Sequence, residues 1–406
     1  MSQTCIIIGA SHAAAQLVFS LRQEGWHGKI TVIGDEASLP YHHPPLSKAF
    51  LRGEKAADEL FIRPLAFYEK HNIDFKLRTR VETINRACKS VMLSSGEILD
   101  YDKLAVCTGS RARELTLPGT ELSGVHYLRT LSDGQSIRNA IASAREAVIV
   151  GGGYIGLETA ASLKSLGINV TVLEMESRVL ARVTSPVVAE FYSRMHQEED
   201  VVIKTGVTVT AFEGADKIER VICSDGSQFE TDLLLIGVGI IPNTELAEAA
   251  GLEVDNGILV DEFARTNDPD IVAAGDCTNH PNAYYGQRLR LECVPNTLEQ
   301  AKSAAASICG MEKEYNTIPW FWSDQYDLKL KIVGLSQGYD QLVIRGDNNN
   351  SRSFVAFYLK SGKLIAADCI NRPQEFLVCK RLIASGSAVD LARLKDENTS
   401  PADFAI

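Results

Sequence analysis

The sequence predicts an α/β fold of two similar domains, the second inserted into the first, followed by a C-terminal α+β domain with an antiparallel sheet. A β-branched apolar run, a glycine-rich turn and a helical pattern follow one another twice. The first run ends at Ile8 and the second at Val150, and each turn begins at the next residue. Strand patterns near Gly257 return the chain to the first domain, and short apolar runs between Gly and Asn turns occupy residues 320–367. Because a strand, a glycine turn and a helix in this order hold the pyrophosphate of a dinucleotide, we predict two Rossmann-like dinucleotide-binding domains.

Length and composition are those of a globular protein. The chain has 406 residues, of which 45% are hydrophobic and 23% charged, enough for two or three domains with sizeable cores. Met1-Ser-Gln-Thr leads directly into the apolar run Cys5–Ile8, without the basic and long apolar regions of a signal peptide. No apolar run approaches the roughly 18 residues of a membrane helix. We therefore expect a soluble cytoplasmic protein.

The charge is negative and unevenly distributed. A formal net charge of -11 argues against general nucleic-acid binding, which needs a basic face. From Asn316 onward there are 11 Lys and Arg against 10 Asp and Glu, so residues 1–315 hold 30 against 42. The C-terminal segment is the part suited to an acidic partner.

The nine cysteines indicate neither a disulfide framework nor a metal site. Their number is odd, and none forms a C-x-x-C pair. Most are expected to be reduced, buried small hydrophobic residues. No metal ligands are predicted.

The first turn follows the strand Cys5–Ile8. Gly9 begins it, and Ser11 and Ala14 stand where the fingerprint has its second and third glycines. The next strand, Lys29–Ile33, ends near Asp35 and Glu36, carboxylates placed to hold an adenosine ribose.

The second turn has the full G-x-G-x-x-G spacing at Gly151, Gly153 and Gly156. One glycine makes the tight turn, one admits the pyrophosphate, and one lets helix and strand pack closely. The following strand, Asn169–Glu174, ends in a carboxylate 18 residues beyond Gly156, close to the position expected for the ribose ligand. This turn is the stronger signal of the two.

Three further strands end in residues suited to a cofactor. Leu104–Cys107 leads into Thr108 and Gly109, Leu233–Ile236 leads into Gly237 and Gly239, and the strand from Asp270 ends at Gly275 and Asp276. The carboxylate of Asp276 is placed to bind a ribityl or ribose hydroxyl. We predict these domain segments: 1–112 and 242–315 for the first dinucleotide-binding domain, 113–241 for the second, and 316–406 for the C-terminal domain.

Six motifs in order resemble those of one family. They are Pro44-Pro-Leu-Ser-Lys48, Tyr127-Leu-Arg-Thr-Leu131, Gly151–Glu158, Gly275-Asp-Cys277, Val294-Pro-Asn-Thr-Leu-Glu-Gln300 and Trp320-Phe-Trp-Ser-Asp-Gln325. Nearly the whole chain resembles the two-dinucleotide-binding flavoproteins of the glutathione reductase superfamily, and within it the FAD-dependent ferredoxin reductases of oxygenase and cytochrome P450 systems. The chain departs from that family at His42-His43, where Asp-Arg is common.

The resemblance implies FAD in the first domain and NADH in the second. It places Lys48 near the flavin, paired with Glu158, and Trp322 between the flavin and the ferredoxin. The residues it implies at FAD are Gly9, Ser11, His12, Ala13, Ala14, Asp35, Glu36, His43, Lys48, Val81, Thr108, Gly109, Arg129, Gly275, Asp276, Val294 and Trp322. Those implied at NADH are Gly151, Gly153, Tyr154, Ile155, Gly156, Glu158, Glu174, Gly237 and Gly239.

The implied activity is hydride transfer from NADH to FAD and delivery of single electrons to an acidic [2Fe-2S] ferredoxin, which feeds a cytochrome P450 or a ring-hydroxylating dioxygenase. Lys302 and Lys331 match positions near the ferredoxin-docking face. Glu174 and Glu176 favour NADH by repelling a 2'-phosphate, although Arg178 and Arg182 stand nearby.

Four alternative functions differ from this one in their use of thiols, of oxygen or of a targeting segment. A disulfide reductase needs a C-x4-C pair near the first helix, and a thiol peroxidase needs a cysteine within residues 38–47; neither is present. A flavin-dependent NADH oxidase remains compatible with the sequence. An NAD-sensing flavoprotein resembling apoptosis-inducing factor is also open, although such a protein is expected to carry a targeting segment and basic runs.

Overall fold

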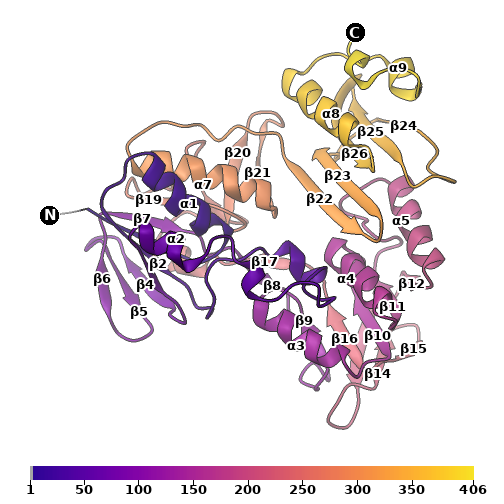
Figure 1. Cartoon of the computed structure of the whole chain (residues 1–406), viewed down its shortest axis with the longest axis horizontal. Coiled ribbons are helices and arrows are strands. Elements are labelled where there is room, and N and C mark those ends of the chain that lie inside the picture. Colours follow the sequence, from indigo (N-terminus) through magenta and orange to yellow (C-terminus); the bar gives the residue numbers. More distant parts are fainter. Residues whose placement is uncertain (1–2) are drawn as a thin grey trace. The chain divides into compact units, whose positions relative to one another are not determined.

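The computed structural model of the chain describes residues 3–406, which divide into two compact units (Figure 1). The first unit comprises Met1–His42, Asp58–Arg111 and Ile240–Pro319. The second comprises His43–Ala57, Ala112–Gly239 and Trp320–Ile406. No helix among residues 3–406 is both long and apolar enough to cross a membrane.

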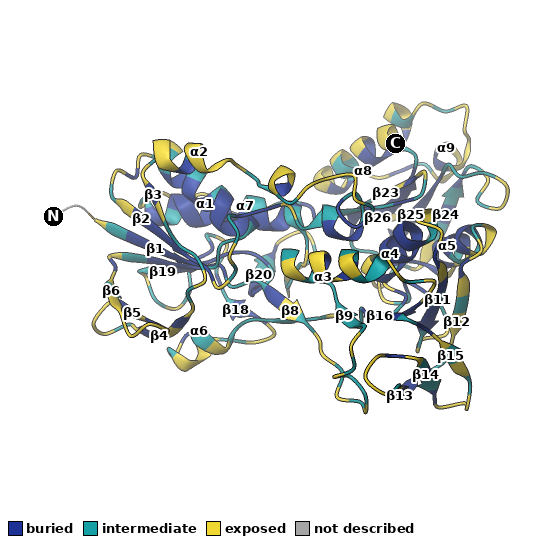
Figure 2. Cartoon of the chain, turned by 60° about the horizontal axis from the view of Figure 1, so that its bottom comes forward, coloured by how far each residue is buried: buried dark blue, intermediate teal, exposed yellow. Residues whose placement is uncertain are grey.

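A parallel sheet of five strands organises the first unit, in the order β19-β7-β1-β2-β3. Its strands are β1 (Thr4–Ile8), β2 (Lys29–Ile33), β3 (Ile73–Lys76), β7 (Lys103–Val106) and β19 (Ile271–Ala273). Their β-branched residues are covered on both faces, as parallel sheets require, and the strands are largely dark blue in Figure 2. Helices α1 (His12–Gln23) and α7 (Val294–Ile308) pack against one face through Leu17 and Ala304.

The other face packs against a smaller antiparallel sheet. This sheet contains β4 (Val81–Asn85), β5 (Ser90–Leu93) and β6 (Ile98–Asp100). The remaining elements of the unit are α2 (Leu65–Lys70), β17 (Ile240–Pro242), α6 (Glu245–Ala249), β18 (Ile258–Leu259), β20 (Thr278–Asn282) and β21 (Gln287–Leu289). Strand β8 (Ser110–Ala112) pairs with β17.

The second unit contains another parallel sheet of five strands, in the order β12-β11-β10-β16-β9. Its strands are β9 (Val125–Tyr127), β10 (Glu146–Val150), β11 (Asn169–Glu174), β12 (Val202–Thr205) and β16 (Leu233–Ile236). The helices are α3 (Leu131–Ile141), α4 (Tyr154–Ser165) and α5 (Pro186–Glu198), and a 3₁₀ helix covers Pro44–Ser47. A small antiparallel sheet combines β13 (Val209–Glu213), β14 (Arg220–Cys223) and β15 (Gln228–Glu230).

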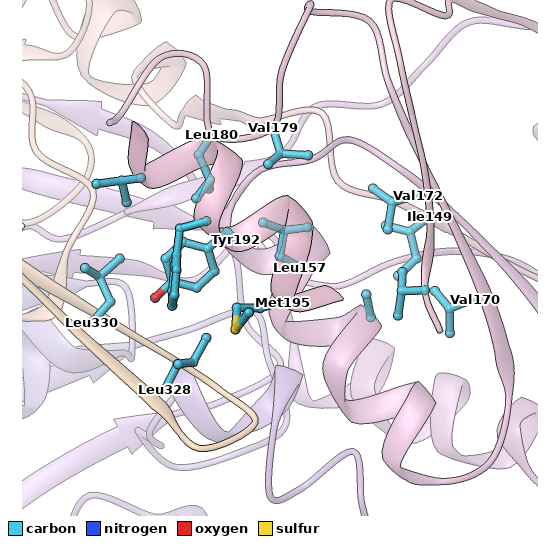
Figure 3. Close-up of a cluster of buried hydrophobic side chains, with 14 of the residues drawn as sticks. Ile149, Leu157, Val170, Val172, Val179, Leu180, Tyr192, Met195, Leu328 and Leu330 are labelled. Carbon is cyan, nitrogen blue, oxygen red and sulfur yellow. The ribbon is translucent and has the colours of Figure 1, made fainter. Parts of the chain in front are cut away.

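An antiparallel sheet of five strands forms the C-terminal part of this unit, in the order β22-β23-β26-β25-β24. The strands are β22 (Trp320–Gln325), β23 (Leu328–Gly334), β24 (Gln341–Arg345), β25 (Phe354–Lys360) and β26 (Lys363–Ile370), followed by α8 (Pro373–Ser385) and α9 (Leu391–Lys395). One apolar core joins this sheet to the parallel one: Leu328 and Leu330 belong to the same cluster as Leu157 of α4 and Tyr192 of α5 (Figure 3). Shared burial therefore ties β23 to α4 and α5.

The predicted fold class is confirmed, including the chain's return to the first parallel sheet at β19 and the antiparallel C-terminal sheet. All nine cysteines are free. Leu157, Ala160 and Leu163 form the buried face of α4, whereas Ile155 and the C-cap residue Leu166 are 48% and 40% exposed.

Candidate active site

The second glycine turn has the geometry of a phosphate cradle. Gly151 has φ +112°, and a Cβ there would lie 2.3 Å from the Gly237 carbonyl oxygen. A Cβ at Gly156 would lie 2.1 Å from the Gly151 carbonyl, whereas one at Gly153 would have no heavy atom within 4 Å. The outer glycines thus close the turn, and Gly153 faces open space at the uncapped N-terminus of α4, where backbone N–H groups attract a phosphate.

The carboxylate at the end of β11 is held beside this cradle. Glu174 Oε2 accepts a hydrogen bond of 2.7 Å from the Gly152 N–H, and Oε1 accepts one of 2.8 Å from the Glu176 N–H. Arg178 donates instead to the backbone carbonyls of Ala181 and Thr184, at 2.8 and 3.0 Å. The acidic group is therefore fixed, and the guanidinium of Arg178 is engaged elsewhere.

A buried ion pair joins the 3₁₀ helix to α4. Lys48 Nζ contacts Glu158 Oε2, and the two side chains are 15% and 3% exposed. The same oxygen accepts a hydrogen bond of 2.7 Å from Ser47 Oγ, while Oε1 accepts one of 2.8 Å from Ser323 Oγ of β22. Every partner donates to the carboxylate, so the Glu158 oxygens act only as acceptors in this site.

The first glycine turn is built on the same plan in the first unit. Gly9 has φ +104°, and a Cβ there would lie 2.1 Å from the Cys107 carbonyl oxygen. Ser11 is the N-cap of α1 and makes no side-chain capping bond. At the end of β2, Asp35 is exposed, whereas Glu36 is half-buried and accepts a hydrogen bond of 2.6 Å from Tyr41. Glu36 is therefore the better oriented of the two for a ribose.

Other expected residues of the first unit gather at the ends of β7 and β19. Thr108 Oγ1 donates to the Asn243 carbonyl at 2.6 Å, beside Gly109. Asp276 accepts a hydrogen bond of 2.8 Å from Ser110. A Cβ at Gly275 would lie 3.6 Å from that of Ala13, which shows that β19 ends against the start of α1. These positions fit a dinucleotide that enters between the N-termini of helices and the strand ends.

The remaining residues that the resemblance implies at FAD or NADH are distributed over both units. His12, Ala13 and Ala14 are buried in α1, Val81 is buried at the start of β4, and Val294 is the first residue of α7. His43 is the N-cap of the 3₁₀ helix, Arg129 precedes the capping box at the start of α3, and Tyr154 and Ile155 begin α4. Gly237 and Gly239 follow β16.

The residues expected at the ferredoxin surface differ in their surroundings. In the second unit, the Trp322 ring lies 5.7 Å from that of Trp320, and Lys331 Nζ lies 5.4 Å above the Phe376 ring. In the first unit, Lys302 pairs with Glu299 at 2.6 Å. Trp322 is only half-buried, so a partner can reach it.

Comparison with known families settles the relationship. Residues 3–307 match the family described as pyridine nucleotide-disulphide oxidoreductase, and residues 320–405 match the domain described as reductase C-terminal. The chain belongs to the pyridine nucleotide-disulphide oxidoreductase family.

This pyridine nucleotide-disulphide oxidoreductase is 43% identical to the putidaredoxin reductase CamA of Pseudomonas putida, over 97% of this chain and 94% of the relative. It is also 38% identical to a rubredoxin-NAD(+) reductase of Pseudomonas putida, over 95% of this chain and 99% of the relative. The crystal structure of a covalent putidaredoxin reductase-putidaredoxin complex matches with a TM-score of 0.96 at 42% identity, covering 99% and 98% of the two chains.

The ferredoxin reductase for the CYP199A2 system from Rhodopseudomonas palustris also matches with a TM-score of 0.96, at 38% identity over 100% of both chains. The resemblance predicted from the motifs is thus confirmed.

Two partners of Glu158 were missed from the sequence. Ser47 and Ser323 are both buried, and both donate to its carboxylate. Each stands inside a motif that carried the resemblance, Pro44–Lys48 and Trp320–Gln325, which is the signal that could have identified them.

Proposed function

We propose that this chain is an NADH-dependent reductase that uses FAD to pass electrons to a [2Fe-2S] ferredoxin, which in turn feeds a cytochrome P450 or a ring-hydroxylating dioxygenase. One NADH supplies two electrons and a proton as hydride; two ferredoxins each accept one electron, and one proton is released. Relatives named as ferredoxin reductases along nearly the whole chain support this proposal.

The buried pair of Lys48 and Glu158 carries the proposal. A cation beside a flavin stabilises the negative charge that arrives with hydride, and a carboxylate holds that cation in position. Ser47 and Ser323 add hydrogen bonds to the same carboxylate, so its charge is balanced without water. No thiol takes part in this chemistry.

The residues of the first unit fit FAD. Gly9 and the start of α1 would hold its pyrophosphate, Glu36 its adenosine ribose, and Asp276 its ribityl hydroxyls. When bound, the flavin accepts two electrons together and releases them one at a time. We assign residues 1–112 and 242–315 to FAD binding.

The second glycine turn fits NADH. Gly151, Gly153 and Gly156 would admit the pyrophosphate, and Glu174 would accept hydrogen bonds from the adenosine ribose. The carboxylate of Glu174 would repel a 2'-phosphate, and Arg178 is occupied by backbone carbonyls. We therefore assign residues 113–241 to NADH and expect a preference for it over NADPH.

The C-terminal segment, residues 316–406, is the proposed interface domain. Trp322 would lie between the flavin and the ferredoxin, where an aromatic ring shortens the distance that an electron crosses. Lys302 and Lys331 would each attract an acidic ferredoxin. We place this reductase in the cytoplasm.

Anaerobic reduction and acceptor assays test the proposed function. The purified protein should be yellow, should be bleached faster by NADH than by NADPH, and should reduce cytochrome c only when a [2Fe-2S] ferredoxin is present. A rubredoxin serves as the comparison acceptor, because two relatives are named rubredoxin-NAD(+) reductase. Rapid oxygen uptake without ferredoxin would instead indicate an NADH oxidase, and NADH binding without turnover would indicate a sensor resembling apoptosis-inducing factor.

A further inference from the structure

A buried chain of four hydrogen bonds leads to Glu158 from the turn between β22 and β23. Tyr326 Oη lies 3.1 Å from His196 Nδ1, and His196 Nε2 lies 2.8 Å from Gln325 Oε1. Gln325 Nε2 donates to Ser323 Oγ at 3.1 Å, and Ser323 donates to Glu158 at 2.8 Å. His196, Gln325 and Ser323 are at most 1% exposed. Water therefore cannot replace any of these three side chains, whereas Tyr326 at the outer end is half-buried.

The donor and acceptor in each bond follow from the charge of Glu158. An ionised carboxylate only accepts, so Ser323 donates to it and must accept from the Gln325 amide nitrogen. The Gln325 oxygen then faces His196, which must carry its proton on Nε2. His196 Nδ1 is left unprotonated and accepts from the Tyr326 hydroxyl. Burial lowers the pKa of His196, which keeps the ring neutral, as this direction requires.

We propose that Tyr326 and His196 are positioning residues for Glu158, acting through Gln325 and Ser323 to hold its carboxylate toward Lys48 while NADH reduces the flavin. This inference rests on the proposed function and assigns a task to residues outside the cofactor sites. Hydrogen bonds in such a chain polarise one another, so that each donor strengthens the next.

The chain has one competing direction, and the charge of Glu158 opposes it. If the proton of His196 moves to Nδ1, the Gln325 amide turns over and Ser323 donates to Gln325 instead of Glu158. The Tyr326 hydroxyl can donate to Nδ1 or accept from it, so it supports the direction that the carboxylate sets. Removing this hydroxyl leaves Nδ1 without its donor, which weakens the hydrogen bonds that lead to Glu158 although Tyr326 does not touch it.

A double-mutant cycle on the rate of flavin reduction by NADH tests the linkage. Tyr326→Phe and Ser323→Ala should each lower the rate constant by about three- to tenfold, the usual size for the loss of one hydrogen bond. The double variant should be no slower than Ser323→Ala alone, because the effect of Tyr326 passes through Ser323. His196→Phe should resemble Tyr326→Phe, and His196→Gln, whose amide can still donate to Gln325, should recover most of the rate.

Tyr192→Phe is the matched control. Tyr192 lies on α5 with His196, is fully buried, and its hydroxyl has no hydrogen-bond partner among residues 3–406. Its removal should leave the rate unchanged. An equal loss of rate in Tyr192→Phe and Tyr326→Phe would overturn the inference. So would a double variant of Tyr326→Phe and Ser323→Ala whose loss of rate equals the product of the two single losses.

Nitrogen-15 NMR of labelled histidine tests the chain without turnover. The His196 ring should be protonated on Nε2 in the wild-type protein and should lose this single form in Tyr326→Phe. A proton on Nδ1 in the wild type would overturn the inference whatever the kinetics. A wild-type protein that NADH fails to reduce would refute the proposed function, whereas reduction with independent effects in the cycle would refute only the role of Tyr326 and His196.

Discussion

The Lys48 ammonium and the Glu158 carboxylate form an ion pair although 110 residues separate them along the chain. Glu158 also joins the 3₁₀ helix, through Ser47, to the C-terminal sheet, through Ser323. Removing one partner of such a buried pair typically costs about 3–5 kcal/mol, because the other charge remains buried without compensation. The carboxylate is therefore a structural junction as well as the proposed partner of the flavin lysine.

Glu174→Ala should relax the preference for NADH. The ratio of kcat/KM for NADH to that for NADPH should fall by about tenfold or more, since the change removes both a ribose acceptor and a negative charge. Glu176→Ala provides the comparison: it removes an exposed negative charge two residues away but no ribose acceptor, so it should lower the ratio less. An unchanged ratio in Glu174→Ala would show that another group selects the nucleotide.

Gly153→Ala should weaken NADH binding without destabilising the protein. Its φ is -80°, and a Cβ there would meet no heavy atom of the chain within 4 Å, so the added methyl group would occupy only the space expected for the pyrophosphate. The Kd for NADH should rise by about tenfold at unchanged melting temperature.

Gly156→Ala provides the contrast to Gly153→Ala. Its Cβ would lie 2.1 Å from the Gly151 carbonyl oxygen, so this variant should be less stable even without ligand. Calorimetry measures the affinity for NADH. An equal affinity in Gly153→Ala and the wild type would contradict the proposal that this turn holds the pyrophosphate of NADH.

Lys331→Glu should slow turnover with an acidic ferredoxin and leave flavin reduction by NADH unaffected. The KM for ferredoxin should rise by about tenfold at low salt, and the difference should shrink as salt screens the charges. Lys360→Glu, at the end of β25 in the same sheet, changes the net charge equally and should have a smaller effect. Turnover that does not depend on ionic strength would exclude electrostatic steering.

Asp368 should make stability depend on pH. Burial raises the pKa of Asp368 from 3.8 to about 6, against the opposing effect of hydrogen bonds from Thr184 and Tyr358. The folded state binds this proton more tightly than the unfolded chain does. The protonated carboxyl therefore adds to the free energy of unfolding below pH 4, and this stabilisation is lost as the pH rises through 6.

Asp368→Asn should remove this dependence. The free energy of unfolding of the wild type, relative to the variant, should fall by roughly 2 kcal/mol between pH 4 and pH 7. Urea denaturation across that range measures the difference. A gap between the two proteins that stays constant with pH would show that the carboxyl does not titrate in this window.

The features that could be predicted from the sequence are local. Gly151, Gly153 and Gly156 lie within six residues, and a strand, a turn and a helix are defined by neighbouring side chains. The pairing of Lys48 with Glu158 followed only from the family resemblance, since nothing in either segment specifies the other.

The buried chain to Glu158 could not be predicted for the same reason. Ser323 and Gln325 point to one face of β22, but their meeting with His196 depends on how that strand packs against α5. A lone histidine in a helical pattern gives no sign of such a partner. The antiparallel sheets β4–β6 and β13–β15 were likewise not distinguished as separate sheets, because their short strands carry few apolar residues.

The rate of flavin reduction by NADH in Lys48→Met and Glu158→Gln, measured by stopped flow without ferredoxin, tests the central claim most directly. Both variants should reduce the flavin at least about tenfold more slowly than the wild type at saturating NADH, and the double variant should be little slower than either, because the two groups act as one unit. Reduction at the wild-type rate in Lys48→Met, with flavin bound and the protein folded, would contradict the account.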